Sequence, residues 1–277
     1  MKKLLTLLVA LLMSVTCIFG LTACNDGGSV RDLDDIIKSG KITVATNAEF
    51  PPFENKEGEN YVGIDIDIAQ AIADYLDVEL VINNMAFESV VTSVQKGQSD
   101  LALAALTINE TRLNAIDFSD DYFGAAKYVI VKADDTTFDD CTTKEQVDTI
   151  LGTLSGIAGA QSGTTGYYYI KGSSAFEFDG FTNLEARGYD TPSEAAMAVA
   201  NNQIKLAIVD DEVANQIVEA NSNVKAIRIA LSTEKYGIGI NKSNKGLAFV
   251  VNKVLAQLKD SGELNAIITR HTSAAAE

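Results

Sequence analysis

Arg112 and Thr107 have side chains that could bind a carboxylate. Both follow the apolar run 101–106, which is typical of a buried β-strand. A guanidinium group can hold a carboxylate through two parallel hydrogen bonds, and a hydroxyl at the strand end can add a third. Arg112 falls in the first turns of the next expected helix, from which its side chain can reach back over the strand end. Position alone also leaves open an ordinary solvated arginine.

A second candidate anion site is the turn Gly163-Thr164-Thr165-Gly166, which follows the strand-like run 156–160 and leads into an expected helix. Free backbone N–H groups and hydroxyls at a helix N-terminus attract an anion. Because the turn lacks the lysine and the glycine spacing of a phosphate-binding loop, a small carboxylate is the expected anion. Simple capping of the helix is the alternative.

Asp210 and Asp211 follow a third strand-like run, 206–209, and open the next helical pattern. One of the two carboxylates can cap that helix, which leaves the other free to pair with a cation. An arginine at one strand end and an aspartate at another suit a zwitterion, with Arg112 on its α-carboxylate and an aspartate on its α-ammonium group.

Two aromatic side chains lie on the loop after the strand-like run 42–46, where Pro51 and Pro52 stiffen the backbone. Phe53 is expected in the core. Phe50, at the strand exit, could pack in the core or face a ligand.

All these candidates depend on an alternation of strand-like runs and helical patterns. Apolar residues recur at helical spacing over 68–76, 147–154 and 250–258, and Thr191 with Glu194 forms a capping box before a further helix. The continuous apolar strands predict an α/β fold with mostly parallel sheets covered by helices on both faces. The alternation is too long for one sheet, so two lobes are expected, with ligands at the carboxyl ends of the strands. The expected strands are 42–46, 78–82, 101–106, 128–131, 156–160, 206–209, 224–230 and 236–240.

The composition argues against several classes of protein. With 38 acidic and 22 basic side chains, the formal charge of −16 disfavours binding to a phosphate backbone. The single histidine, His271, argues against a histidine-rich metal site and against a Ser-His-Asp triad. We expect neither a metal nor a cofactor. A Cys141–His271 nucleophile pair stays open, although the acidic neighbours of Cys141 disfavour a thiolate.

Residues 1–23 are expected to be a secretory signal peptide rather than part of the fold. Lys2 and Lys3 precede an uncharged apolar run, and the segment ends in Leu21-Thr22-Ala23-Cys24. This ending resembles the lipobox of bacterial lipoproteins, in which Cys24 would become the lipidated first residue of an extracytoplasmic, membrane-anchored protein. An uncleaved membrane anchor is the alternative. Processing would leave Cys141 as the only unmodified cysteine, so no intrachain disulfide is expected.

Several motifs occur in a characteristic order along the chain. The first are Lys41-Ile-Thr-Val-Ala-Thr-Asn-Ala-Glu-Phe-Pro-Pro-Phe-Glu54 and Gly63-Ile-Asp-Ile-Asp-Ile-Ala69. They are followed by Phe87-Glu-Ser-Val-Val, Thr107-Ile-Asn-Glu-Thr-Arg112-Leu-Asn-Ala-Ile-Asp-Phe-Ser119, Ser162-Gly-Thr-Thr165, Ile208-Val-Asp210 and Tyr236-Gly-Ile-Gly-Ile240. Over nearly all of residues 38–271, this order resembles the family 3 extracellular solute-binding proteins, the polar amino-acid receptors of ABC importers.

The resemblance implies a periplasmic-binding-protein fold of the type II-like kind, in which each lobe is a sheet flanked by helices and two hinge strands join the lobes. After the signal peptide, residues 24–37 would be the lipidated Cys24 and a tether. Lobe 1 would comprise 38–126 together with 233–277, and lobe 2 would comprise 127–232.

The resemblance also implies roles for the candidate site residues. Arg112 would hold the α-carboxylate of an amino acid, helped by Thr107 and the Gly-Thr-Thr turn. Asp210 and the backbone carbonyl of Ala105 would take the α-ammonium group. The expected ligand contacts are Asn47, Phe50, Phe87, Ala105, Thr107, Arg112, Gln161, Thr164, Thr165 and Asp210.

The ligand's own side chain would lie between Phe50 and Phe87. Asn47 stands where family members commonly have Asp, and its neutrality argues against a basic ligand. Gln161 and Val209, near positions that vary with specificity, supply no charge either. Glutamine is therefore the first expectation among the polar amino acids.

Glu49 and Asp211 are acids close enough in sequence to the site to leave the ligand open. They also allow an enzyme, since some relatives are cyclohexadienyl dehydratases and either acid could serve as the general acid of an elimination. A ligand sensor is a third possibility. The favoured function is capture of a polar amino acid by a monomeric, lipid-anchored binding protein that passes it to an ABC permease.

Overall fold

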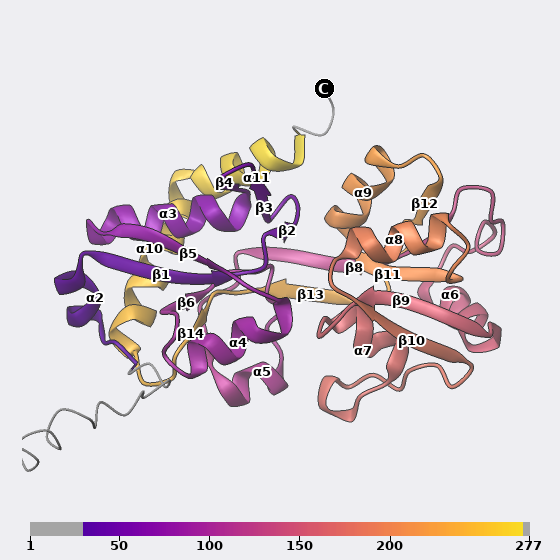
Figure 1. Ribbon diagram of the computed structural model, residues 1–277, viewed down its shortest axis with the longest axis horizontal. Coiled ribbons are helices and arrows are strands. Elements are labelled where there is room, and N and C mark those ends of the chain that lie inside the picture. The colour runs from indigo at the N-terminus through magenta and orange to yellow at the C-terminus, as the bar shows by residue number, and fades with distance from the viewer. Residues whose placement is uncertain (1–29, 274–277) are drawn as a thin grey trace, which may run out of the picture.

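A computed structural model describes residues 30–273, so the expected signal peptide, Cys24 and the first part of the tether lie outside the described residues. It has two separate main sheets, each flanked by helices, as expected for a two-lobe α/β fold (Figure 1). Helix α2 (Leu33–Ser39) begins inside the segment expected to be tether and buries Ile36 completely. The folded part of the chain therefore begins before residue 38.

The first sheet has a parallel centre and an antiparallel edge. Strand β1 pairs in parallel with both β5 and β6, whereas β14 runs antiparallel to β6 and β7. The strand order is β5 (Glu79–Asn84), β1 (Lys41–Thr46), β6 (Leu101–Ala102), β14 (Gly239–Ile240) and β7 (Asp117–Phe118). In Figure 1 one group of helices lies above this sheet and another below it. Above the sheet lie α3 (Ile64–Leu76) and α11 (Glu263–Ser273), and below it lie α4 (Phe87–Gln95) and α5 (Glu110–Ala115). Helix α10 (Lys245–Ser261) packs against α3 and α11.

The second sheet has the same mixed character. Its strands β10, β9 and β11 are parallel, and β8 runs antiparallel to β11 and β12. The order is β10 (Leu184–Tyr189), β9 (Gly156–Gln161), β11 (Leu206–Asp210), β8 (Phe123–Lys132) and β12 (Val224–Ile227). Its helices are α6 (Lys144–Thr153), α7 (Thr165–Lys171), α8 (Pro192–Ala200) and α9 (Asp211–Ala220), with the short η1 (Ser174–Phe176) after α7. The capping box expected at Thr191 and Glu194 is present at the start of α8.

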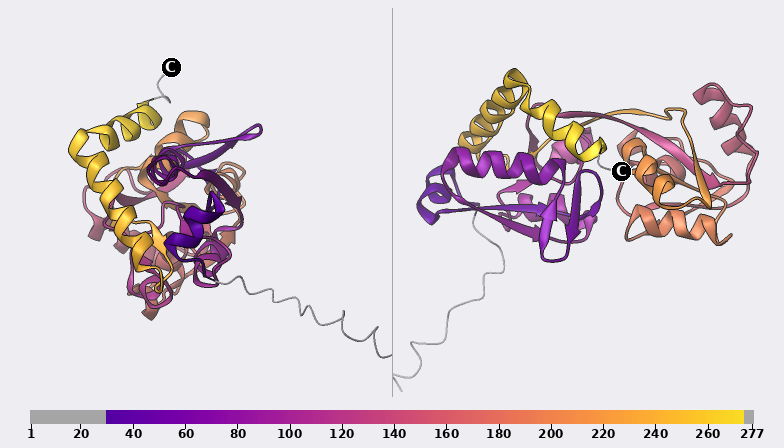
Figure 2. Two further views of the ribbon diagram at one scale, coloured as in Figure 1. Left: turned by 90° about the vertical axis from the view of Figure 1, so that its left-hand side faces the viewer. Right: turned by 90° about the horizontal axis from the view of Figure 1, so that it is seen from above.

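Two antiparallel strands cross from one sheet to the other. Strand β13 (Thr233–Tyr236) pairs with the first half of β8, from Phe123 opposite Tyr236 to Ala126 opposite Thr233. Both strands bridge the two lobes in Figure 1 and in the right-hand view of Figure 2. A further small sheet next to the crossing consists of β2 (Glu49–Phe50), β3 (Glu54–Glu57) and β4 (Asn60–Val62).

The chain leaves the first sheet earlier than the apolar run 101–106 predicts. Only Leu101 and Ala102 belong to β6, and Ala105 has a left-handed backbone with φ of 46°. The run stays fully buried because the following loop packs beneath α4 and against β13, where Thr107 forms an isolated bridge with Tyr236. Burial, rather than strand pairing, explains why this segment is apolar.

Candidate functional site

Arg112 lies on α5 at the carboxyl end of the first sheet and is 5% exposed, so it is not a solvated surface arginine. Asn109 caps the helix by accepting a hydrogen bond from the Arg112 backbone N–H at 2.9 Å. The guanidinium turns back over the loop: Nη1 donates to the Thr107 carbonyl at 2.8 Å, and its carbon lies 5.3 Å from the centre of the Phe87 ring. Nη2 reaches the Gly163 carbonyl of the other lobe at 3.5 Å.

Burial lowers the pKa of Arg112 to about 10, and the nearby carboxylates of Glu234 and Asp210 oppose that shift. The guanidinium therefore keeps its charge at neutral pH. A buried, charged arginine with one face on an aromatic ring is suited to bind an anion.

Asp210 occupies the N-cap position of α9, yet its side chain forms no capping hydrogen bond. Its carboxylate instead pairs with Lys127, whose Nζ lies 2.5 Å from Oδ1, and accepts a hydrogen bond from the Tyr236 hydroxyl. Asp210 is 6% exposed. Burial raises its pKa, and the ammonium group of Lys127 works against that increase. Of the two roles that the sequence left open for this pair of aspartates, Asp210 has the one that pairs with a cation.

Glu234 connects the two expected anion-binding hydroxyls. Its Oε2 accepts hydrogen bonds from Thr107 Oγ1 at 2.6 Å and Thr165 Oγ1 at 2.9 Å, and it lies 3.0 Å from Lys127 Nζ. Burial alone would raise the pKa of Glu234, but the ammonium group of Lys127 and the two hydroxyls bring it down to about 2. The carboxylate is therefore charged at neutral pH.

Lys127 and Glu234 were not among the residues expected from the sequence. Lys127 is the one charged residue inside the apolar run 125–131 of β8, and that interruption is the signal that could have found it. For Glu234 the corresponding signal is weaker, because β13 alternates exposed and buried residues and is polar at both kinds of position.

Gln161, Asn47 and Thr164 form the side of the site that spans the two lobes. Gln161 Nε2 donates to Asn47 Oδ1 at 2.7 Å, and Asn47 Nδ2 donates to the Met85 carbonyl at 2.9 Å. Gln161 Oε1 is buried, and no group within residues 30–273 donates a hydrogen bond to it. Thr164 accepts from the Tyr167 N–H at 3.3 Å and donates to the Gln161 carbonyl, so its hydroxyl caps α7. Thr164 thus follows the capping alternative, whereas the hydroxyl of Thr165 is directed to Glu234.

Of the three aromatic candidates, Phe53 was expected in the core, Phe50 was left open, and Phe87 was expected beside the ligand. Phe53 is completely buried and packs edge-on against Phe123 and Tyr236 in the core. Phe50 is 6% exposed, and its ring centre lies 6.3 Å from that of Phe53. Phe87 packs against the Arg112 guanidinium and also lines a cavity.

The backbone of Ala105 is held in place by Asp65 of α3. The Ala105 N–H donates to Asp65 Oδ2 at 2.9 Å, and Tyr122 donates to the other carboxylate oxygen at 2.6 Å. Burial raises the pKa of Asp65 to about 6, against the effect of these two hydrogen bonds. The left-handed turn that precedes Thr107 is thereby fixed by a side chain from a helix on the other face of the sheet.

A cavity of about 330 Å³ opens between the lobes beside Phe87. Its lining comes from both lobes and includes three carboxylates and no basic side chain. The lining residues are Asn47, Glu49, Asn84, Met85, Ala86, Phe87, Glu88, Ser162, Tyr189 and Asp190. Glu49 is exposed at this cavity, and in the described part of the chain no side-chain hydrogen bond joins Glu49 or Asp211 to Arg112, Asp210 or Glu234.

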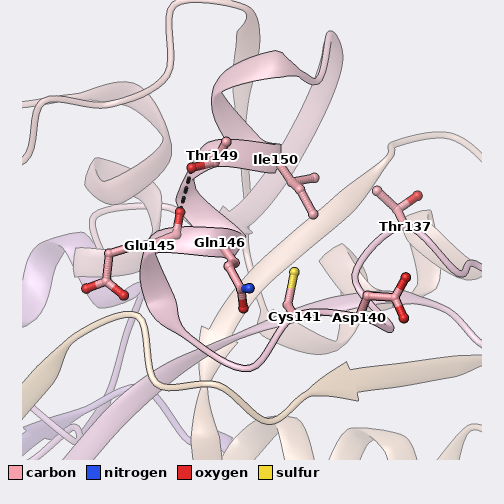
Figure 3. A pocket seen from close by; sticks show the side chains of 7 residues that line it. All are labelled: Thr137, Asp140, Cys141, Glu145, Gln146, Thr149 and Ile150. Carbon is pink, nitrogen blue, oxygen red and sulfur yellow. Dashed lines mark hydrogen bonds between the residues drawn. The ribbon is translucent and has the colours of Figure 1, made fainter.

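Cys141 and His271 do not form a pair. Cys141 lines a cavity of about 400 Å³ beside α6, where none of the side chains shown in Figure 3 is basic. His271 lies on α11 in the other lobe, with Nε2 2.8 Å from Asp67 Oδ2. Within residues 30–273, no group of histidine, cysteine and acidic side chains has the arrangement of a metal site. Among the described helices, none has the length and apolarity needed to cross a membrane.

Two α/β lobes joined by a pair of crossing strands, with charged groups of both lobes buried at the junction, define a two-lobe solute-binding protein. The chain belongs to the bacterial extracellular solute-binding proteins, family 3, whose family model matches residues 42–274.

Relatives in this family include amino-acid-binding proteins of ABC transporters. The chain is 29% identical over 269 residues to the arginine-binding extracellular protein ArtP of Bacillus subtilis, with 95% of each chain covered. It is 28% identical to the amino acid ABC transporter substrate-binding protein AbpA of Streptococcus pneumoniae, whose structure was solved with L-arginine. The two structures match with a TM-score of 0.76, and the match covers 88% of this chain and 99% of that chain. An ancestral arginine-binding protein, solved with glutamine, is 30% identical with a TM-score of 0.72, and the match covers 84% of this chain and 97% of that chain.

Proposed function

We propose that this chain captures a polar α-amino acid between its two lobes for delivery to an ABC importer. The observation that carries the proposal is the burial, at one junction, of Arg112 from the first lobe and Asp210 from the second. An arginine can hold the α-carboxylate in bidentate fashion, and an aspartate can hold the α-ammonium group. Thr107 and Thr165 supply hydroxyls beside them, one from each lobe.

The lobes in this proposal are residues 38–126 with 233–277, and residues 127–232, with α2 packed on the first. The hinge is the ladder of β8 and β13, because these strands cross between the sheets. Closure stabilises the bound state only through contacts that the amino acid makes with both lobes. Arg112 and Asp210 satisfy this requirement because they come from different lobes.

The ligand side chain is expected to be rich in hydrogen-bond donors. The cavity beside Phe87 is lined by Glu49, Glu88 and Asp190. Gln161 Oε1 is a buried acceptor that has no donor in the described part of the chain. These acceptors favour L-arginine, and L-glutamine, the first expectation from the sequence, remains the second choice. The relatives bound to arginine and to glutamine support the same two candidates.

The expected lipid anchor completes the proposal. Leu21-Thr22-Ala23-Cys24 would give a monomeric lipoprotein outside the cytoplasmic membrane, close to the permease that accepts the ligand. If Cys24 is the lipidation site, Cys24→Ser releases the protein into the medium or periplasm, whereas Cys141→Ser leaves it with the membrane fraction. Equal membrane retention of both variants would contradict the anchor.

A thermal-shift screen of the purified chain against the twenty amino acids and cystine tests the function directly, because a ligand that binds the native state raises the melting temperature. We expect the largest increase with L-arginine or L-glutamine, and calorimetry then gives the affinity. No increase with any amino acid would contradict the proposal.

A further inference from the structure

One carboxylate oxygen in the structure occupies the position of an anion bound by both lobes. Glu234 Oε2 accepts the hydroxyl of Thr107 from the first lobe and the hydroxyl of Thr165 from the second. These are the same two hydroxyls that the proposed function assigns to the ligand's α-carboxylate. The other oxygen, Oε1, accepts from Ser232 at 3.0 Å, so the carboxylate is held at both ends.

One ammonium group correspondingly occupies the position of a cation bound by Asp210. Lys127 Nζ lies 2.5 Å from Asp210 Oδ1 and 3.0 Å from Glu234 Oε2. The side chains of all three residues are at most 8% exposed. Asp210 is the residue that the proposed function assigns to the ligand's α-ammonium group, and its second oxygen already accepts from Tyr236.

We propose that Lys127 and Glu234 form an internal substitute for the charged groups of an amino acid, which competes with the ligand for Asp210, Thr107 and Thr165. This inference rests on the proposed function, since it takes from it the groups that hold the ligand. It adds two residues that are outside the expected contacts and gives them a role opposed to ligand binding.

The position of the pair in the fold explains how it would act. Lys127 follows the part of β8 that pairs with β13, and Glu234 is on β13, so both belong to the crossing strands. From there the pair reaches Thr107 on one lobe and Thr165 and Asp210 on the other. Its hydrogen bonds and ion pairs therefore hold the lobes together without help from a ligand.

An amino acid must displace this pair, or share its partners, before it can bind. When the binding-competent arrangement is only a fraction of the population, the apparent affinity falls by that fraction. The internal pair thus raises the ligand concentration that is needed for binding. Residues 127 and 234 therefore affect the affinity although they make no favourable contact with the ligand.

The test replaces both charged groups together, because removal of only the lysine would leave buried carboxylates without their cation. The variant Lys127→Gln/Glu234→Gln is compared with Lys41→Gln/Glu79→Gln, which makes the same changes at an exposed pair 3.1 Å apart. Calorimetry measures binding of L-arginine and L-glutamine, and small-angle X-ray scattering measures the radius of gyration without added ligand. We expect Lys127→Gln/Glu234→Gln, the hinge variant, to bind the preferred amino acid at least about fivefold more tightly than the wild type. It should also have a larger radius of gyration without added ligand. The control variant should match the wild type in both measurements.

Unchanged or weaker binding by the hinge variant would overturn the proposal, as would an unchanged radius of gyration. If the wild-type chain binds no amino acid, the proposed function fails, and the scattering comparison still decides whether the pair holds the lobes together. If circular dichroism shows that the double variant is unfolded, Glu234→Gln replaces it, because that change keeps the Lys127–Asp210 pair. The same directions of change are then expected, and their absence again overturns the inference.

Discussion

At the scale of single residues, Arg112 is fixed by the loop that it covers. Its Nη1 contacts the Thr107 carbonyl and its guanidinium carbon faces the Phe87 ring, so the charge is positioned before a ligand arrives. Little rotamer freedom is left to lose on binding, and a positioned, desolvated cation binds a carboxylate more strongly than a mobile one. Affinity for the α-carboxylate should therefore depend on this side chain more than on any hydroxyl around it.

Arg112→Ala is expected to weaken amino-acid binding by about 2–5 kcal/mol, because the α-carboxylate loses its buried counter-ion. Titration calorimetry measures the change. Arg228→Ala, which removes an exposed arginine on the second lobe, is the matched control and should bind like the wild type. Binding by Arg112→Ala within about twofold of the wild type would remove Arg112 from the site.

The site residues that could be predicted are those that follow the carboxyl ends of strands, where α/β sheets bind their ligands. Arg112, Thr107, Thr165 and Asp210 all follow apolar runs, and the structure brings them to one junction. Lys127 and Glu234 reach the same junction from the middle of crossing strands. The lysine within the apolar run 125–131 marks Lys127 as unusual, but its meeting with Glu234 depends on the pairing register of β8 with β13. That register connects residues more than 100 positions apart, so the local sequence does not predict it.

At the scale of elements, the approach of the two lobes depends on the turn before α7. Gly163 has a φ of +75°, and a Cβ there would lie 2.7 Å from Glu88 Cγ on α4 of the other lobe. The glycine therefore meets two requirements, a left-handed backbone and a close contact between lobes. Gly262, which ends α10 with a φ of +80°, meets only the first, since a Cβ added there would have no neighbouring atom within 4 Å.

Gly163→Ala should weaken amino-acid binding more than Gly262→Ala, because only the former adds a clash that opposes closure. Both variants should lose a similar amount of stability, about 1 kcal/mol, from the left-handed backbone. Calorimetry and urea unfolding of the two variants separate the effects. Equal binding by both variants would show that the contact between Gly163 and Glu88 does not limit closure.

Long, strongly patterned elements were the predictable part of the fold. The apolar stripes over 68–76, 147–154 and 250–258 all fall within helices or at their ends, and the capping box of α8 formed as expected. Strand β10 was not predicted because residues 184–189 include a glutamate, an arginine and a glycine and form no apolar run. They form a strand because they pair in parallel with β9. The small sheet of β2, β3 and β4 was missed because its strands are short and mostly polar.

At the scale of the whole molecule, the formal charge of −16 coexists with several buried acids in the described structure. Glu54 is completely buried, and no other described residue donates a hydrogen bond to either of its carboxyl oxygens. Burial, and then the neighbouring carboxylate of Asp65, raises the pKa of Glu54 well above its ordinary value. Burial also raises the pKa of Asp65 to about 6. Both groups hold protons more tightly in the folded state than in the unfolded state.

Acids with a raised folded-state pKa give stability that is complete below their unfolded pKa and is lost as the pH rises through the folded pKa. The free energy of unfolding should therefore decrease from about pH 4 to about pH 7, by at most about 3 kcal/mol for the Asp65 shift. Glu234, whose pKa is lowered to about 2, acts in the opposite direction, and its contribution is lost as the pH falls below about 4.5. Urea unfolding from about pH 2 to about pH 7 measures the sum of the two trends.

Glu54→Gln should flatten this decrease, because it removes one buried group that holds its proton more tightly in the folded state than in the unfolded state. Glu59→Gln removes the same charge from an exposed position and should keep the wild-type slope. An equal slope in all three proteins would mean that the Glu54–Asp65 pair does not control the pH dependence.

The most direct test of the account is calorimetry of the wild-type chain with its preferred amino acid and with the decarboxylated analogue, agmatine for arginine or 4-aminobutanamide for glutamine. Because the α-carboxylate is expected to bind Arg112, the amino acid should bind with a dissociation constant of roughly micromolar or lower, and the analogue at least about 100-fold more weakly. Binding of the analogue as tightly as the amino acid would contradict a carboxylate held between the lobes.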